Sequence, residues 1–134
     1  MHASPSSDHH AGPVTSDTVV VMPAFNEGPS VADAVHAALL HFPCVVVVDD
    51  GSADDTAAIA HRAGAVVIRH PVNLGQGAAL QTGFEWALLQ GAQWVVTLDS
   101  DGQHDPQDAL RLLAMAQEQR ADAALGSRFL GRTE

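Results

Sequence analysis

The chain has 134 residues, which is enough for one domain, and 46% of them are hydrophobic, which is enough for a buried core. No apolar run is long enough to cross a membrane. A formal net charge of −10 without any lysine argues against nucleic acid as a partner, because basic side chains neutralise its phosphates. The single cysteine, Cys44, cannot form a disulfide within the chain, which fits a cytoplasmic location. The 8 histidines lack the spacing of metal ligands and are expected at the surface or in the N-terminal tail.

Residues 1–17 are rich in Ser, Pro, His and Asp and show no periodicity, which predicts a disordered tail before a domain that spans 18–134. Within the domain, apolar β-branched runs alternate with segments of helical spacing. The predicted strands cover 18–22, 44–48, 65–69, 94–98 and a weaker 121–126. The predicted helices end near Pro43, Gly64 and Gln90, and the last one begins at Asp105. Pro23 is expected to end the first strand, and Ser30 is expected to cap the first helix.

This alternation predicts an α/β fold with a doubly wound, mostly parallel, Rossmann-like sheet and helices on both faces. In such folds, ligands bind outside the carboxyl ends of the strands. Polar side chains gather at this edge, namely Asn26, Glu27, Asp49, Asp50, Asp99 and Asp101. Their convergence indicates a ligand site more strongly than any single motif does.

Two acids, Asp99 and Asp101, follow the fourth predicted strand and are separated by one residue. If the chain stays extended there, both carboxylates point the same way. Hard divalent ions such as Mg²⁺ or Mn²⁺ bind carboxylates together with substrate phosphates. The pattern therefore indicates a metal site, and the alternative is a pair of solvated turn residues.

The acids after the second strand allow two interpretations. Asp49 and Asp50 could cap the next helix, or one of them could accept hydrogen bonds from a base or ribose while the other supports the loop. Arg128, which follows the fifth predicted strand, fits phosphate binding and a surface role equally well.

Five segments carry a further pattern: Pro23–Glu27, Val48–Thr56, Asn73–Ala79, Asp99–His104 and Gly126–Phe129. In order and spacing they resemble the family 2 glycosyltransferases from about residue 18 onward. The Asp-Ser-Asp-Gly-Gln-His form of the fourth segment and the Gly-Ser-Arg of the fifth are most similar to the branch that transfers sugars to polyprenyl phosphates, the dolichyl-phosphate mannosyltransferase type.

The resemblance implies a GT-A fold, a UDP- or GDP-sugar donor, a Mg²⁺ or Mn²⁺ ion and inversion at the anomeric carbon. By position, it implies nucleotide-binding roles for Pro23, Phe25, Glu27, Val48, Asp50, Ser100 and Arg128. It implies metal-side roles for Asp99, Asp101 and Gln103. Gln76 stands where the family often has a basic residue, which puts one phosphate contact in doubt. No catalytic base is identified. A lipid-phosphate acceptor depends less on a base than a glycan hydroxyl does, because the phosphate is already ionised near pH 7.

The family's catalytic domain continues beyond its Gly-Ser-Arg segment, so we expect a domain that is incomplete at the C-terminus. A partner chain would then supply the acceptor half, at the cytoplasmic face of a membrane if the acceptor is a lipid phosphate. One alternative is a nucleotide-sugar-binding fragment without activity of its own. Another is a phosphatase of the haloacid dehalogenase type, because the segment Leu98–Gly102 resembles the nucleophile motif of that family. The chain, however, has no lysine to serve as that family's basic residue.

Overall fold

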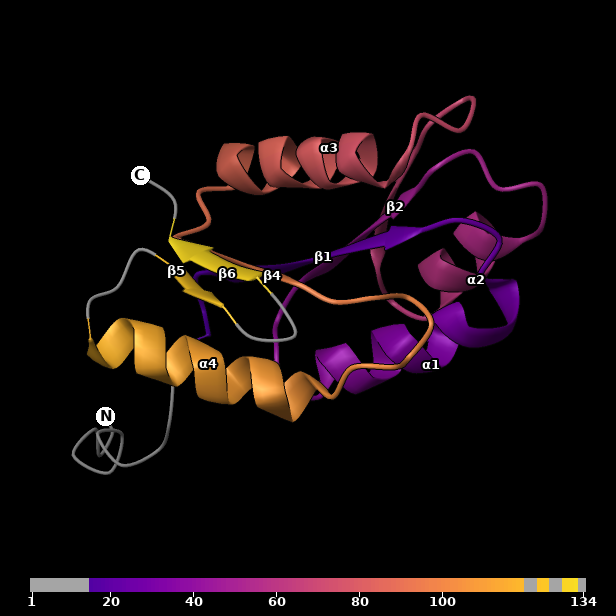
Figure 1. Ribbon diagram of the computed structural model, residues 1–134. Helices are drawn as coiled ribbons and strands as arrows, with labels where there is room; N and C mark the ends of the chain where they lie inside the picture. Colours follow the sequence, from indigo (N-terminus) through magenta and orange to yellow (C-terminus); the bar gives the residue numbers. More distant parts are fainter. Residues whose placement is uncertain (1–14, 120–122, 126–128, 133–134) are drawn as a thin grey trace, which may run out of the picture.

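The computed structural model describes residues 15–119, 123–125 and 129–132, and it describes side chains as far as Gln119. Strands and helices alternate along most of this part of the chain (Figure 1). The strands are β1 (Thr18–Ala24), β2 (Val45–Asp49), β3 (Val66–Arg69), β4 (Trp94–Thr97), β5 (Ala123–Leu125) and β6 (Phe129–Arg132). The helices are α1 (Gly28–Leu39), α2 (Thr56–Arg62), α3 (Gln76–Leu89) and α4 (Pro106–Glu118). The first four predicted strands are all present. Of the predicted tail, residues 1–14 lie outside the described part.

The strands form one sheet in the order β3-β2-β1-β4-β6-β5. The first four in this order are parallel, which confirms the predicted mostly parallel α/β sheet. β6 runs antiparallel to β4 and to β5 and therefore separates the fourth predicted strand from the fifth. The sequence analysis does not predict β6, because these four residues have no alternating pattern and become a strand by pairing with the distant β4.

Helices cover both faces of the sheet, as predicted. α1, α2 and α4 pack on one face, and α3 packs on the other (Figure 1). The valines of β2 divide between the two cores: Val45 and Val47 pack with α1, whereas Val46 and Val48 pack with α3. A strand that is apolar at every position is what a parallel sheet covered on both faces requires. Each of these buried valines stabilises the fold by about 1.5–3 kcal/mol relative to an exposed one.

Pro23 does not end β1, contrary to the prediction, because the strand continues to Ala24. The carbonyl of Ala24 accepts a hydrogen bond from Asp50 N on the β2 side. The backbone N–H and C=O groups of successive residues in a strand point to opposite neighbouring strands, so the nitrogen of Pro23 faces β4. The pairing of β1 with β4 ends at Val21, before Pro23 is reached. A proline is tolerated at this position because no donor is needed there.

Ser30 does not cap the first helix, which is a second correction. α1 begins at Gly28, and Pro29 occupies its first turn, where a missing N–H costs no helical hydrogen bond. The Oγ of Ser30 instead lies 3.0 Å from both Glu27 Oε2 and Ser100 O, so it shares its proton between two acceptors. This contact ties the start of α1 to the loop after β4.

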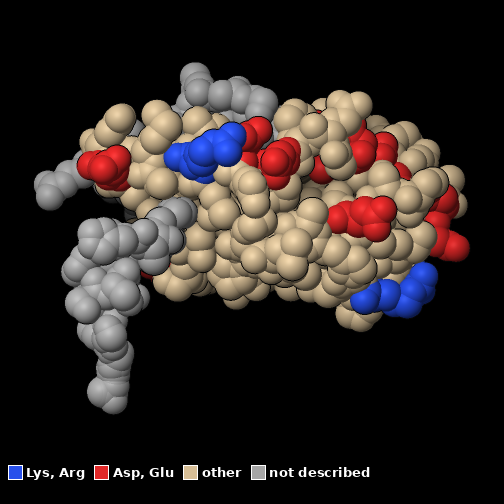
Figure 2. All heavy atoms as spheres, turned by 90° about the horizontal axis from the view of Figure 1, so that it is seen from below, with Lys and Arg blue, Asp and Glu red and all other residues tan. Residues whose placement is uncertain are grey.

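Negative charge is spread over the face that α1, α2 and α4 cover, where acidic side chains are more widespread than basic ones (Figure 2). The negative charge of the protein therefore repels a phosphate ligand, which needs compensating positive charge at its binding site. Within the described residues, no helix combines the length and the apolar character needed to cross a membrane.

Gly83 lets α3 approach β1 closely, since a Cβ at this position would lie 2.3 Å from Cγ1 of the fully buried Val21. We expect Gly83→Ala to lower the free energy of unfolding by about 1–3 kcal/mol, as overpacking does, in urea denaturation followed by circular dichroism. Gly77→Ala is the matched control on the same helix, because its Cβ would meet open space. It should leave stability unchanged or raise it slightly. Equal losses in both variants would contradict the close packing.

Candidate functional site

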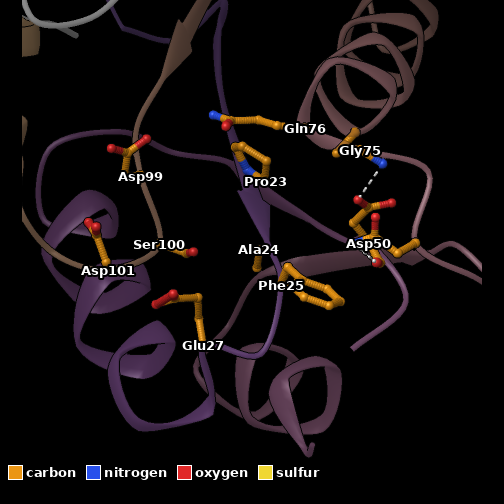
Figure 3. Close-up of a pocket in the computed structure, with 12 residues that line it drawn as sticks. Pro23, Ala24, Phe25, Glu27, Asp50, Gly75, Gln76, Asp99, Ser100 and Asp101 are labelled. Carbon is orange, nitrogen blue, oxygen red and sulfur yellow. Dashed lines mark hydrogen bonds between the residues drawn. The ribbon is translucent and has the colours of Figure 1, made fainter. Parts of the chain in front are cut away.

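The carboxyl edge of the parallel strands holds a pocket with a volume of about 390 Å³ (Figure 3). The residues that line it come from the ends of β1, β2 and β4 and from the start of α3. They are Pro23, Ala24, Phe25, Glu27, Asp50, Asn73, Gly75, Gln76, Ala79, Asp99, Ser100 and Asp101. Most of the site residues predicted from the sequence therefore share one cavity, at the edge where ligands of this fold class bind.

One side of the pocket is acidic. Asp99, Ser100 and Asp101 follow β4, and the carboxylate of Glu27 points toward them from the residue before α1 (Figure 3). Ser100 is buried, and its carbonyl accepts the hydrogen bond from Ser30 that also reaches Glu27. The three carboxylates thus form one acidic wall of the pocket, and Ser30 joins the loops after β1 and β4 behind it.

The oxygen atoms of this wall fit a hard divalent cation. Asp99 is partly buried, with Oδ2 lying 3.1 Å from His104 Nδ1, and Asp101 is exposed, with Oδ1 accepting a hydrogen bond from Gln103 N. In the part of the chain that the structure describes, no group of three or more His, Cys, Asp or Glu residues is arranged to hold a metal ion. The chain therefore offers two carboxylates, and water and phosphate oxygens would complete the shell, as is usual for Mg²⁺.

Two of the predicted residues, Val48 and Gln103, do not line the pocket in the structure. The side chain of Gln103 is exposed outside it, and only the backbone N–H of this residue contributes, to Asp101. Val48 is fully buried in the core beneath α3, because its side chain points off the face of the sheet and not off the end of β2. Arg128 lies outside the described residues.

The first of the two acids after β2 has a structural role. Asp49 is fully buried, and its Oδ1 accepts a hydrogen bond from Ser52 N at 3.0 Å. Its Oδ2 lies 3.5 Å from Arg69 Nε on the neighbouring strand β3. Asp49 therefore shapes the turn after β2, which agrees with the interpretation that one acid supports the loop.

The second acid, Asp50, lines the pocket and is held by three donors. Its Oδ1 accepts hydrogen bonds from His70 Nδ1 and Leu74 N, and its Oδ2 accepts one from Gly75 N, all at 2.8 Å. Burial raises the pKa of the Asp50 carboxyl, but the hydrogen bonds from His70 and from the two backbone amides outweigh this effect. The net pKa lies below its ordinary value, so Asp50 is ionised at neutral pH.

The loop after β1 is fastened to the loop after β2. Asn26 has a positive φ of 54°, which asparagine tolerates better than most residues. Its backbone N–H donates to Ser52 Oγ and its Oδ1 accepts from Ala53 N, both at 2.8 Å. Glu27 N donates to Thr56 Oγ1 at 2.9 Å. These bonds fix the segment that presents Phe25 and Glu27 to the pocket.

The start of α3 faces the pocket from the other side. Gly75 precedes the helix with φ 103° and ψ 160°, a conformation that is essentially restricted to glycine. No side chain caps the first turn of α3, and Gly75, Gln76 and Ala79 line the pocket, so the positive end of the helix dipole borders it. Gln76 adds a neutral side chain, which extends over Pro23 (Figure 3).

Two residues of this region were missed by the sequence analysis. His70 is only 8% exposed and binds Asp50, so the expectation of surface histidines is wrong for this residue. Asn73 lines the pocket, and its Nδ2 donates to Asp50 O at 3.2 Å. The position of His70 in the sequence could have indicated its role. It directly follows the third predicted strand and so falls at the same edge of the sheet as Asp50.

Residues 19–134 match the family model described as Glycosyl transferase family 2. The chain belongs to this family. The match confirms the resemblance that rests on the five segments, and it removes the support for a phosphatase of the haloacid dehalogenase type.

Relatives of known sequence include enzymes that act on lipid-linked phosphates. A polyprenol monophosphomannose synthase from Mycolicibacterium smegmatis is 37% identical over 125 residues, which cover 87% of this chain and 46% of the relative. A UDP-N-acetylglucosamine–dolichyl-phosphate N-acetylglucosaminyltransferase from Methanococcus voltae is 29% identical and matches 82% of this chain and 51% of its own length. The chain thus spans about half the length of the curated relatives that it matches.

Solved structures place the fold among the GT-A glycosyltransferases. A glucosyl-3-phosphoglycerate synthase from Mycobacterium tuberculosis, crystallised with Mn²⁺, UDP and glucosyl-3-phosphoglycerate, superposes with a TM-score of 0.58 at 26% identity. The superposition covers 87% of this chain and 46% of that structure. The sheet and helices described above are therefore part of a larger GT-A fold in these neighbours.

Asp50 should make stability sensitive to acid. Folding lowers the pKa of the Asp50 carboxyl. Its contribution to the free energy of unfolding is therefore fully present above the unfolded-state pKa of about 3.9 and is lost as the pH falls through the folded-state pKa. Asp50→Asn should therefore lower stability by about 1–3 kcal/mol at pH 7 and flatten its decline below about pH 4. Urea denaturation over this pH range measures both effects. Asp33→Asn, an exposed carboxylate on α1, is the control and should retain the wild-type slope.

Proposed function

We propose that this chain forms the donor-binding part of a glycosyltransferase that uses a nucleoside diphosphate sugar and a Mg²⁺ or Mn²⁺ ion. The observation that carries the proposal is the composition of one pocket, in which Asp99 and Asp101 lie on one side and Asp50 and the start of α3 lie on the other. Membership of family 2 supports the reaction class.

The donor would lie across this pocket with its nucleoside near Phe25. The Phe25 side chain is 47% exposed although it lines a cavity, and its ring lies beside Asp50 (Figure 3). An exposed ring at a pocket wall offers a face on which a base can stack. Pro23 and Ser100 would border the nucleotide, and the diphosphate would lie between the first turn of α3 and the Asp99–Asp101 wall. By its position in the family pattern, Arg128 would add a phosphate contact.

The acidic wall needs a cation before it can accept a diphosphate, because like charges repel strongly in a partly dry pocket. Asp99 and Asp101 would hold the Mg²⁺ or Mn²⁺ ion, together with oxygens of the diphosphate. When bound, the ion supplies positive charge where the leaving diphosphate becomes more negative. The mycobacterial synthase crystallised with Mn²⁺ and UDP supports the use of a divalent cation.

A polyprenyl phosphate is the acceptor that we favour, because relatives that match most of this chain are named for transfer to such lipids. The phosphate is largely ionised near pH 7, so it can attack without a strong general base, which agrees with the absence of an identified base. Attack opposite the leaving diphosphate would invert the anomeric centre. A lipid acceptor would bring the protein to the cytoplasmic face of a membrane.

Nucleotide binding should depend on a divalent metal and on Asp101. We expect UDP or GDP to bind in Mn²⁺ and to lose more than about tenfold in affinity in EDTA or in Asp101→Asn, since uncompensated carboxylates repel the diphosphate. Isothermal titration calorimetry measures both. Asp105→Asn is the control, because it removes a charge from the same loop but keeps an N-cap acceptor for Gln107 N at the start of α4. Equal affinity with and without metal would contradict the proposal.

Phe25 should contribute to nucleotide affinity and little to stability. Phe25→Ala removes an exposed ring, so we expect the melting temperature to stay near wild type while binding of UDP or GDP weakens by about 1–3 kcal/mol, the usual size of base–aromatic stacking. Leu40→Ala is the control, because Leu40 is 80% exposed at the far end of α1. Unchanged affinity in Phe25→Ala would place the base elsewhere.

A turnover assay separates an active transferase from a fragment that only binds the donor. The chain is incubated with radiolabelled UDP- or GDP-sugar, Mn²⁺ and a polyprenyl phosphate, alone and after extension with the downstream sequence of a full-length relative. Holding donor and acceptor in line can be worth roughly 7–11 kcal/mol, and every described pocket residue belongs to the donor side of the proposal. We therefore expect transfer by the extended chain and very little by the 134-residue chain.

A further inference from the structure

A buried chain of hydrogen bonds lies behind the wall that Asp50 contributes to the pocket. Asp50 Oδ1 lies 2.8 Å from His70 Nδ1, and His70 Nε2 lies 2.9 Å from Thr82 Oγ1. His70 is 8% exposed and does not line the pocket, and neither does Thr82. The three residues come from the end of β2, the residue after β3 and the second turn of α3, so the chain joins three elements at one point.

The partners of His70 determine which ring nitrogen carries a proton. Asp50 is ionised at neutral pH, and a carboxylate can only accept hydrogen bonds. The proton of the Asp50–His70 contact therefore lies on His70 Nδ1. In the neutral ring, Nε2 is then an acceptor, and it takes the hydroxyl proton of Thr82. When neutral, the His70 ring is thus held as the Nδ1–H tautomer, the less common form of a free neutral histidine side chain.

The order acid–histidine–hydroxyl resembles that of a nucleophilic triad, but the surroundings of Thr82 exclude this role. Thr82 lies in the middle of α3, and the next residue, Gly83, packs directly against Val21 of β1. The Thr82 hydroxyl is bound to His70 Nε2, and Thr82 does not line the pocket. The chain of hydrogen bonds can act on the pocket only through Asp50.

We infer that His70 is a positioning residue, which holds the Asp50 carboxylate and, through it, the first turn of α3 in the orientation that receives the donor. The inference rests on the proposed function for the identity of the ligand. Asp50 uses its remaining lone pairs on Leu74 N and Gly75 N, the two amides before α3. Loss of the His70 donor frees the carboxylate to rotate, and both amides then lose their fixed acceptor.

The tautomer can be read directly by nitrogen NMR of the histidine rings in the free 134-residue chain at neutral pH. We expect the His70 ring to show a protonated Nδ1 and an unprotonated Nε2, and the signal is assigned to His70 because it vanishes in His70→Asn. Thr82→Val should keep the Nδ1 proton and shift the Nε2 resonance. A His70 ring that carries its proton on Nε2 alone would overturn the inference.

Two substitutions of His70 separate positioning from stability. In His70→Asn the amide nitrogen takes the place of Nδ1 and can still donate to Asp50, but nothing reaches Thr82. In His70→Phe the ring volume stays and both hydrogen bonds are lost. With Mn²⁺ present, we expect UDP or GDP affinity to fall about tenfold in His70→Phe and to stay within about threefold of wild type in His70→Asn. Both variants should melt below wild type, because both lose the Thr82 contact.

A merely structural role would weaken nucleotide binding in every variant that melts below wild type, including His70→Asn and Thr82→Val, which keep the donor to Asp50, and that result would overturn the inference. His61→Asn, at an exposed histidine of α2, is the control and should change neither quantity. If the wild-type chain binds neither nucleotide in Mn²⁺, the proposed function fails. The tautomer and the melting temperatures then still decide whether His70 holds Asp50.

Discussion

The register of β1 with its two neighbours is the constraint on which the pocket depends. Ala24 pairs with Asp49, and Val21 pairs with Thr97, so three strands end at one edge and their loops meet there. β1 also sets the position of α3, because Gly83 packs against Val21 without room for a Cβ. The end of β1 and the start of α3 are therefore coupled, although they face the pocket from different sides.

Charge organises the pocket into two walls. Glu27, Asp99 and Asp101 repel a diphosphate, whereas the uncapped first turn of α3 attracts one. A divalent cation bound to the acidic wall would neutralise its repulsion, so that a diphosphate could contact both this wall and the start of α3. Asp50 differs from the other acids, because its charge is already used by three donors within the protein. Its role is therefore to shape the wall and to hold the loop before α3.

The layer behind the pocket is built from residues without an obvious catalytic signature. Ser30 links Glu27 to Ser100, Thr56 anchors the loop after β1, and His70 holds Asp50. Each of these side chains makes a hydrogen bond to a loop that borders the pocket.

The sequence by itself determined the alternation of strands and helices, the mostly parallel sheet, the edge at which the pocket lies and the family. These features follow from local periodicity, from the point where each apolar run ends and from short motifs in register.

Only the tertiary structure decided the roles of individual polar residues: Asp49 supports a turn while Asp50 faces the pocket, His70 is buried, and Val48 and Gln103 lie outside the pocket. It also decided that Pro23 stays within β1 and that β6 exists. The physical reason is distance along the chain, since Asp50 and His70 are separated by 20 positions and Ser30 and Ser100 by 70. No local pattern encodes such a contact, because folding alone brings its two partners together.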